Sequence, residues 1–206
     1  EQKQEALGAF TEFKVFLRDL LATRADANDD SLIGLALRAQ QSGTLNEEET
    51  LVNLISMMIA GHETTVTLIG NGMLLLLRNP TEMERLRKEP DLMRTAIEEF
   101  LRMEPGGNMI LRVALEDLEV EGVRIPKGFP VIGLIGAINR DPERFERPDD
   151  LDIGRRANAQ FTFGGGAHVC IGAPLARYEG QVAFSSFLGK YQSIELAGEP
   201  EWRLDR

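Results

Sequence analysis

Hydrophobic residues recur at helical spacing along the first part of the chain. Residues 3–24 place Phe10, Phe13, Leu17 and Leu20 on one face, which predicts an amphipathic helix, and a shorter helix is expected near residues 30–40. Asn46 and a glutamate three residues later have the spacing of a capping box. They predict the start of an unusually long helix over residues 47–78.

The pattern changes twice after Arg78. Asn79 and Pro80 are expected to end the long helix and to cap the next. Further helices are predicted near 80–88, 90–103 and 174–189, and a short strand over SIEL, residues 193–196. Short apolar runs over 109–135 predict small β-hairpins, and the weakly periodic 139–160 predicts an ordered meander. The predicted fold class is mainly α with minor β.

Composition narrows the class of protein. The 206 residues are 43% hydrophobic and 27% charged, which suits one globular domain or a large piece of one. A net charge of −10 argues against a nucleic-acid partner. The longest apolar runs, LISMMIA and MLLLL, are interrupted and too short to span a bilayer, and no signal peptide opens the chain. One cysteine excludes an internal disulfide, and a cytoplasmic protein without membrane contact is expected.

The single cysteine, Cys170, lies in the stretch FTFGGGAHVCIGAP. A lone cysteine is most often a small buried hydrophobic residue. Here glycines on both sides permit close approach of a planar ligand, and Pro174 opens a helix whose N-terminal dipole favours a thiolate. Thiolate is the form that binds iron. Zinc is the rival, but His62, His168 and one cysteine fall short of the usual ligand set.

FTFGGGAHVCIGAPLAR resembles the haem-binding loop of the cytochrome P450 monooxygenases, whose pattern is FxxGxxxCxG followed by a helix. Phe163, Gly166, Cys170 and Gly172 occupy the fixed positions. The resemblance implies that Cys170 is the axial ligand of the iron of haem b, that Phe163 shields the thiolate, and that His168 holds a haem propionate.

A second stretch, AGHETT, interrupts the long apolar helix at residues 60–65. The unremarkable reading is a helix irregularity tolerated for packing, because glycine inside a helix costs about 1 kcal/mol. The stretch is similar to the oxygen-activation motif of the same family. That similarity implies that Thr64 donates to dioxygen bound at the iron, that Glu63 relays protons, and that Ala60 and Gly61 leave room for the oxygen.

Two charged elements complete the resemblance. In EEFLR, Glu99 and Arg102 are three residues apart, and alone they would form an ordinary surface ion pair. Beside the other motifs they resemble the ExxR pair that supports the haem loop, with Arg155 of the meander as the third partner. Arg112 resembles the arginine that binds a haem propionate; its alternative is a solvated strand residue.

The resemblance covers nearly the whole chain and matches the carboxy-terminal half of the family, so residues 1–206 are expected to form the carboxy-terminal haem-binding portion of a cytochrome P450 domain. It implies a monooxygenase that inserts one atom of O2 into a small hydrophobic substrate with electrons from a ferredoxin or flavodoxin. Arg155, Arg156 and Arg177 would face such a donor, or are simply solvated. A haem-binding fragment without turnover and a non-catalytic structural α-protein remain alternatives. The expected pocket residues are Ser56, Ile59, Ala60, Asn108, Met109 and Ile110.

Overall fold

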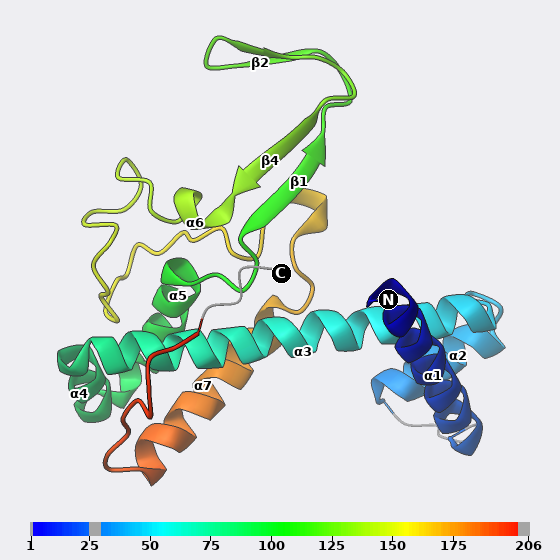
Figure 1. Cartoon of the computed structure of the whole chain (residues 1–206), viewed down its shortest axis with the longest axis horizontal. Coiled ribbons are helices and arrows are strands. Elements are labelled where there is room, and N and C mark those ends of the chain that lie inside the picture. Colours follow the sequence, from blue (N-terminus) through cyan, green and yellow to red (C-terminus); the bar gives the residue numbers. More distant parts are fainter. Residues whose placement is uncertain (1, 25–29, 202–206) are drawn as a thin grey trace. The chain divides into compact units, whose positions relative to one another are not determined.

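The computed structural model describes residues 2–24 and 30–201, and it confirms the mainly helical class with a minor β component (Figure 1). The chain forms two compact units, residues 1–62 and 63–206. The helices are α1 (Gln2–Thr23), α2 (Leu32–Gln41), α3 (Glu47–Arg78), α4 (Pro80–Lys88), α5 (Met93–Met103), α6 (Ile135–Ile138) and α7 (Ala173–Lys190), with 3-10 turns η1 (Pro90–Leu92) and η2 (Gly166–His168).

The first unit is helical and has its own apolar core. Helix α1 contributes Leu17 and Leu21, and α3 contributes Leu51 and Ile55. The predicted capping box is confirmed: the Asn46 amide donates to Glu49 Oε2 at 2.8 Å and the Glu49 amide donates to Asn46 Oδ1 at 2.9 Å. These two hydrogen bonds satisfy amides at the start of α3 that have no partner within the helix.

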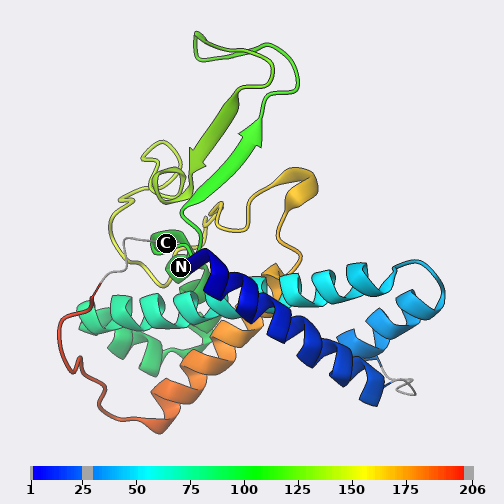
Figure 2. The ribbon, with the colours of Figure 1, turned by 45° about the vertical axis from the view of Figure 1, so that its right-hand side comes forward.

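The second unit gathers α4, α5 and α7 around the carboxy-terminal part of α3 (Figures 1 and 2). Pro80 stands in the first turn of α4, as predicted. Asn79, however, does not cap α4 with its side chain; its Nδ2 donates to Leu75 O at 2.8 Å and so closes the end of α3. Fully buried side chains from all four helices form the core, among them Leu68, Leu76, Leu86, Ile97, Phe100 and Phe184.

Two glycines allow these helices to pack closely. A Cβ at Gly72 of α3 would lie 2.7 Å from Phe184 Cζ and 2.9 Å from Phe100 Cδ2. A Cβ at Gly180 of α7 would lie 3.1 Å from Ile97 Cδ1. The missing side chains therefore provide the space in which the aromatic rings of α5 and α7 meet α3.

We expect Gly72→Ala to destabilise the chain by about 1–3 kcal/mol, because overpacking a filled core costs more than the helix gains from alanine. Gly70→Ala is the matched control on the same helix, since nothing lies within 4 Å of a Cβ there. It should stabilise the chain by about 0.5–1 kcal/mol. Urea unfolding of the two variants measures the difference, and equal midpoints would show that the rings move aside without cost.

The second unit also contains two small antiparallel sheets, as the apolar runs predicted. Strand β1 (Met109–Val113) pairs with β4 (Pro130–Leu134), with Met109 opposite Leu134. Between them, β2 (Leu118–Val120) pairs with β3 (Val123–Ile125) through a two-residue turn at Glu121 and Gly122, both with positive φ. Primed turns of this kind match the twist of paired strands.

Two predictions about single segments are corrected. Residues 193–196 form no strand in the described structure; Ile194 instead packs against the core of the second unit, so its burial needs no partner strand. By length and composition alone, helix α3 is long and apolar enough to cross a membrane. The sequence expectation considered the runs LISMMIA and MLLLL within this helix separately and judged each too short to span a bilayer. Only 17% of this apolar window is buried, although α3 also supplies Leu68 and Leu76 to the core of the second unit.

Candidate functional site

Backbone hydrogen bonds within the loop between residues 161 and 172 shape its conformation. The amide of Gly164 donates to Phe161 O at 2.8 Å, and the amide of Cys170 donates to Phe163 O at 2.9 Å. Gly164 and Gly166 have φ of +69° and +73°, values that disfavour any residue with a side chain. The glycines noted in the sequence are therefore required for the path of the loop as well as for space.

The loop presents the thiol of Cys170 outward, at the start of α7. The thiol is free and exposed, and the neighbouring side chains of Val169 and Ile171 are 55% and 89% exposed. A Cβ at Gly172 would lie 3.8 Å from Cys170 Sγ, at ordinary contact distance, so Gly172 is the residue directly beside the sulfur. Helix α7 begins three residues after this sulfur, at Ala173, with Pro174 in its first turn.

This arrangement fits the haem group that the sequence motif implies. An exposed thiol flanked by two exposed aliphatic side chains offers a sulfur ligand and an apolar surface for a planar macrocycle. Nothing lies within 4 Å of a Cβ built at Gly166, so the face of the loop is open there. Within residues 2–24 and 30–201, no group of three or more His, Cys, Asp or Glu side chains is placed to share a metal ion.

Phe163 connects this loop to the helices behind it. Its ring is half-buried against the core of the second unit, and the guanidinium of Arg177 on α7 lies 4.5 Å from the ring centroid. Strand β1 also reaches the loop, since a Cβ at Gly164 would lie 3.5 Å from Ile110 Cδ1. The loop is therefore held from α7 and from β1.

The stretch AGHETT continues α3 without a break, and its residues divide between the two units. Glu63 and Thr64 open the second unit, and Thr64 lies beside the turn after α5: a Cβ at Gly106 would lie 3.3 Å from Thr64 O. The next residue, Thr65, donates through Oγ1 to Glu179 Oε2 of α7 at 3.0 Å. Ser56, Ile59, Ala60 and Gly61 lie in the first unit, where Ser56 and Ile59 are exposed.

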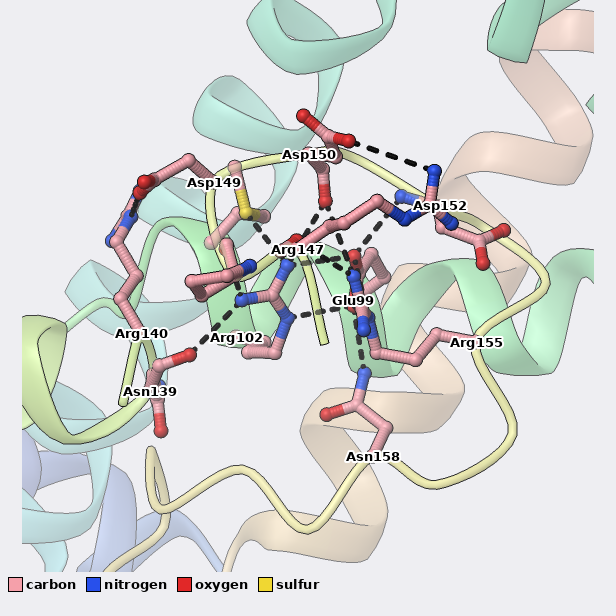
Figure 3. Close-up of polar contacts among 12 residues, drawn as sticks. Glu99, Arg102, Asn139, Arg140, Arg147, Asp149, Asp150, Asp152, Arg155 and Asn158 are labelled. Atoms are coloured by element: carbon pink, nitrogen blue, oxygen red, sulfur yellow. Dashed lines mark hydrogen bonds and ion pairs between the residues drawn. The ribbon is translucent and has the colours of Figure 1, made fainter. Parts of the chain in front are cut away.

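The structure buries Glu99 and Arg102 completely, which excludes the ordinary surface pair (Figure 3). Two parallel hydrogen bonds of 2.8 Å join Arg102 Nε and Nη2 to the two oxygens of Glu99. Arg155 Nε adds contacts of 3.2 Å to both oxygens, and its side chain is 10% exposed. The structure thus brings the three predicted residues into one charged cluster.

The cluster fixes the meander mainly through backbone groups. Arg102 Nη1 donates to Asn139 O at 3.0 Å and to Pro148 O at 2.6 Å, and Arg155 Nη1 donates to Glu146 O at 2.8 Å (Figure 3). Since carbonyl oxygens belong to every residue type, no sequence motif marks these positions. The two arginines satisfy their donors while they order the chain that leads to the cysteine loop.

Two asparagines that the sequence motifs did not single out extend this support toward the loop. Asn158 Nδ2 donates to Glu99 Oε2 at 3.0 Å. The buried Asn139 accepts from the Phe161 amide at 2.7 Å and donates to Thr162 Oγ1 at 3.0 Å. Asn139 begins the stretch NRDP, residues 139–142, which resembles an element of the cytochrome P450 family and is the sequence signal for this residue.

Helix α4 holds the same meander with a second glutamate and arginine at i, i+3. Glu82 Oε2 accepts from the Ile153 amide at 3.2 Å, and Arg85 Nη1 contacts Asp152 Oδ1 at 3.3 Å. Partial burial works against the charged form of Arg85, but the Asp152 hydrogen bond and the charge of Glu82 outweigh it and raise the Arg85 pKa. A Cβ at Gly154 would lie 2.5 Å from Arg85 Nη2, so this contact requires glycine.

The remaining predicted residues are placed as follows. Arg112 is exposed on β1 and donates to Leu111 O at 2.9 Å, and His168 is exposed at the end of η2. Asn108 and Met109 are exposed beside the half-buried Ile110. Of the three arginines expected to face a donor, Arg155 and Arg177 are engaged by Glu99 and Glu98, which leaves Arg156 as the exposed one.

Comparisons with known proteins agree with this architecture. A profile of the family described as cytochrome P450 matches residues 2–205. The biotin biosynthesis cytochrome P450 of Bacillus subtilis (strain 168) is 43% identical over 188 residues, which are 91% of this chain and 47% of that protein. The structure of P450BioI in complex with an acyl carrier protein ligated to hexadec-9Z-enoic acid superposes with a TM-score of 0.86 and 42% identity, over 97% of this chain and 50% of that one.

A P450 from Bacillus megaterium in complex with testosterone superposes with a TM-score of 0.89 and 32% identity, over 97% of this chain and 56% of that one. The chain therefore spans about half the length of the relatives it matches. The predicted fold, the carboxy-terminal portion of the cytochrome P450 architecture, is confirmed by these superpositions. By its sequence profile and its structure, the chain belongs to the cytochrome P450 family.

Proposed function

We propose that this chain is the haem-binding portion of a haem-thiolate monooxygenase. The observation that carries the proposal is the exposed thiol of Cys170 in a loop that its own glycines, Phe163 and the Glu99 cluster hold in place. When bound, haem b supplies the iron centre at which dioxygen is reductively activated. The residues of the chain provide the ligand, the loop's rigidity and the protons.

Each residue contributes a separate physical step. The Cys170 sulfur, just before the start of α7, would bind the iron. His168 and Arg112, both exposed, would hold the propionates through charge-assisted hydrogen bonds. Gly172 keeps the space beside the sulfur open.

Thr64 and Glu63 of α3 would supply protons. The Thr64 hydroxyl would hold a proton that the Glu63 carboxylate replenishes. Ala60 and Gly61 have small side chains or none, which leaves space along the same helix. In the second unit, Asn108, Met109 and Ile110 would contact the substrate. Relatives crystallised with testosterone and with a hexadecenoyl carrier protein support an apolar small-molecule substrate.

The reaction needs electrons that none of the described side chains can store. We propose a ferredoxin or flavodoxin as the donor, in the cytoplasm. Arg156 is an exposed cation of the meander, and Arg94 on α5 lines the same cavity of about 600 Å³. These two guanidiniums would receive acidic groups of the donor, whereas Arg155 and Arg177 are occupied within the chain.

The test is the absorption spectrum of the haem-reconstituted chain, reduced and under carbon monoxide. A Soret band shifted far to the red is expected, since that shift reports thiolate ligation. A protein that takes up no haem would contradict the proposal. A haem-binding portion without turnover is the second candidate, and it would give the band but no oxygenated product.

Thr64→Ala tests proton delivery separately from ligation. In the catalytically competent protein, the variant should keep its haem and its carbon monoxide band, because Thr64 does not belong to the cysteine loop. Loss of the hydroxyl should divert reductant into hydrogen peroxide, so the ratio of product to NAD(P)H consumed should fall about tenfold or more. Thr64→Ser is the matched control, since it retains the hydroxyl. An unchanged ratio in Thr64→Ala would make AGHETT a packing feature only.

A further inference from the structure

The guanidinium of Arg177 lies over the Phe163 ring, and Arg177 belongs to the first part of α7, which follows the cysteine loop. Its Nε and Nη2 bind the two carboxylate oxygens of Glu98 on α5 at 2.5 and 3.1 Å. Glu98 is fixed in turn by Gln160, whose Nε2 donates to Oε2 at 3.1 Å. These contacts join residues up to 79 positions apart, and none of them is part of the ExxR cluster.

Within the ion pair of Arg177 and Glu98, the cation is the member that contacts the cysteine loop. The cation lies against Phe163, and the carboxylate lies on the α5 side of it. Phe163 is also the residue whose carbonyl oxygen accepts from the Cys170 amide at 2.9 Å. Phe163 therefore links the two contacts: its ring meets the guanidinium of Arg177, and its carbonyl oxygen accepts the hydrogen bond that shapes the cysteine turn.

We propose that Arg177 is a positioning residue for Cys170. Its guanidinium, held by two hydrogen bonds to Glu98, fixes the Phe163 ring by a cation–π contact and brings a positive charge to the residue that binds the Cys170 amide. The inference rests on the proposed function, because it takes the Cys170 sulfur as the haem ligand. Hydrogen bonding and charge around a ligating sulfur tune the reduction potential of the iron it holds.

The positioning part is tested without haem. Hydrogen exchange of the Cys170 amide is measured in the haem-free chain and in Arg177→Gln, Glu98→Gln and Arg94→Gln. Arg177→Gln should exchange about two- to fivefold faster, and Glu98→Gln should also exchange faster, because the Phe163 ring loses its clamp. Arg94→Gln is the matched control: it removes the same charge from the same cavity without touching Phe163. An unchanged rate in Arg177→Gln overturns the proposal whether or not haem binds.

The electrostatic part is tested by the reduction potential of the haem-reconstituted proteins. Removing the cation in Arg177→Gln should lower the potential, and removing the neighbouring anion in Glu98→Gln should raise it. If Arg177 and Glu98 act only structurally, the two variants should shift the reduction potential in the same direction. That result overturns the proposed effect of the charges on the potential. Arg177→Lys, which keeps the charge, should stay close to the unmodified protein even if Arg177→Gln folds poorly. If the unmodified chain shows no thiolate band, the proposed function fails while the exchange measurement still decides the positioning.

Discussion

Glu99→Ala should destabilise the second unit by about 3–5 kcal/mol. The substitution leaves the buried guanidinium of Arg102 without its counter-ion and removes the main partner of Arg155, and an unpaired buried charge carries a cost of that size. Because net stabilities of domains are only about 5–15 kcal/mol, the variant should lose much of its cooperative unfolding and most of its haem uptake. Urea unfolding followed by circular dichroism, together with haem titration, measures both.

Two control variants isolate the cause of this destabilisation. One separates the effect of the charge from that of side-chain shape, and the other separates the effect of a buried ion pair from that of an exposed one. Glu99→Gln keeps two polar atoms in place but loses the negative charge. Its free energy of unfolding should therefore lie between that of the unmodified protein and that of Glu99→Ala. Glu84→Ala breaks an exposed i, i+4 pair with Lys88 on α4 and should change the free energy of unfolding by less than about 0.5 kcal/mol. If Glu99→Ala unfolds like Glu84→Ala, the buried cluster contributes no more than a surface bridge.

Features set by neighbouring residues were predictable from the sequence. The Asn46 and Glu49 capping box, Pro80 in the first turn of α4 and the turn at Gly122 each depend on a few adjacent positions. The turn from Phe163 to Cys170 belongs to this class, since its backbone hydrogen bonds join residues at most seven positions apart, whereas the Asn139 contacts to Phe161 and Thr162 do not. A pattern read along the chain contains all the information that such features need.

Features set by distant residues were predicted only where a family motif marked them. Arg155 was expected beside Glu99 by resemblance, whereas Asn158 and the Asp152 amide reach the same carboxylate without any signal in the sequence. The pairing of Glu98 with Arg177 was missed for the same reason, and Arg177 was instead expected to face a donor. The strand predicted for residues 193–196 failed because a strand depends on a partner that periodicity cannot identify.

Cys170→Ala should abolish the thiolate-type band of the reduced carbon monoxide complex completely. The chain contains no second cysteine, so no other thiolate can take its place. Alanine fits the loop, because the Cys170 amide, not its side chain, makes the hydrogen bond to Phe163 O. The free energy of unfolding of the haem-free variant should therefore change little, and the spectral loss would report ligation and not misfolding.

Two neighbouring variants complete this experiment. Cys170→Ser keeps an oxygen at the position of the sulfur, so haem that binds should show an altered axial bond and a Soret band without the far-red shift. Ile171→Ala removes an 89% exposed aliphatic side chain next to the thiol; it should weaken haem binding by up to about tenfold, through lost apolar contact, while the band stays in place. A band that persists unchanged in Cys170→Ala would show that the iron is held elsewhere, and the function proposed for the loop would then be wrong.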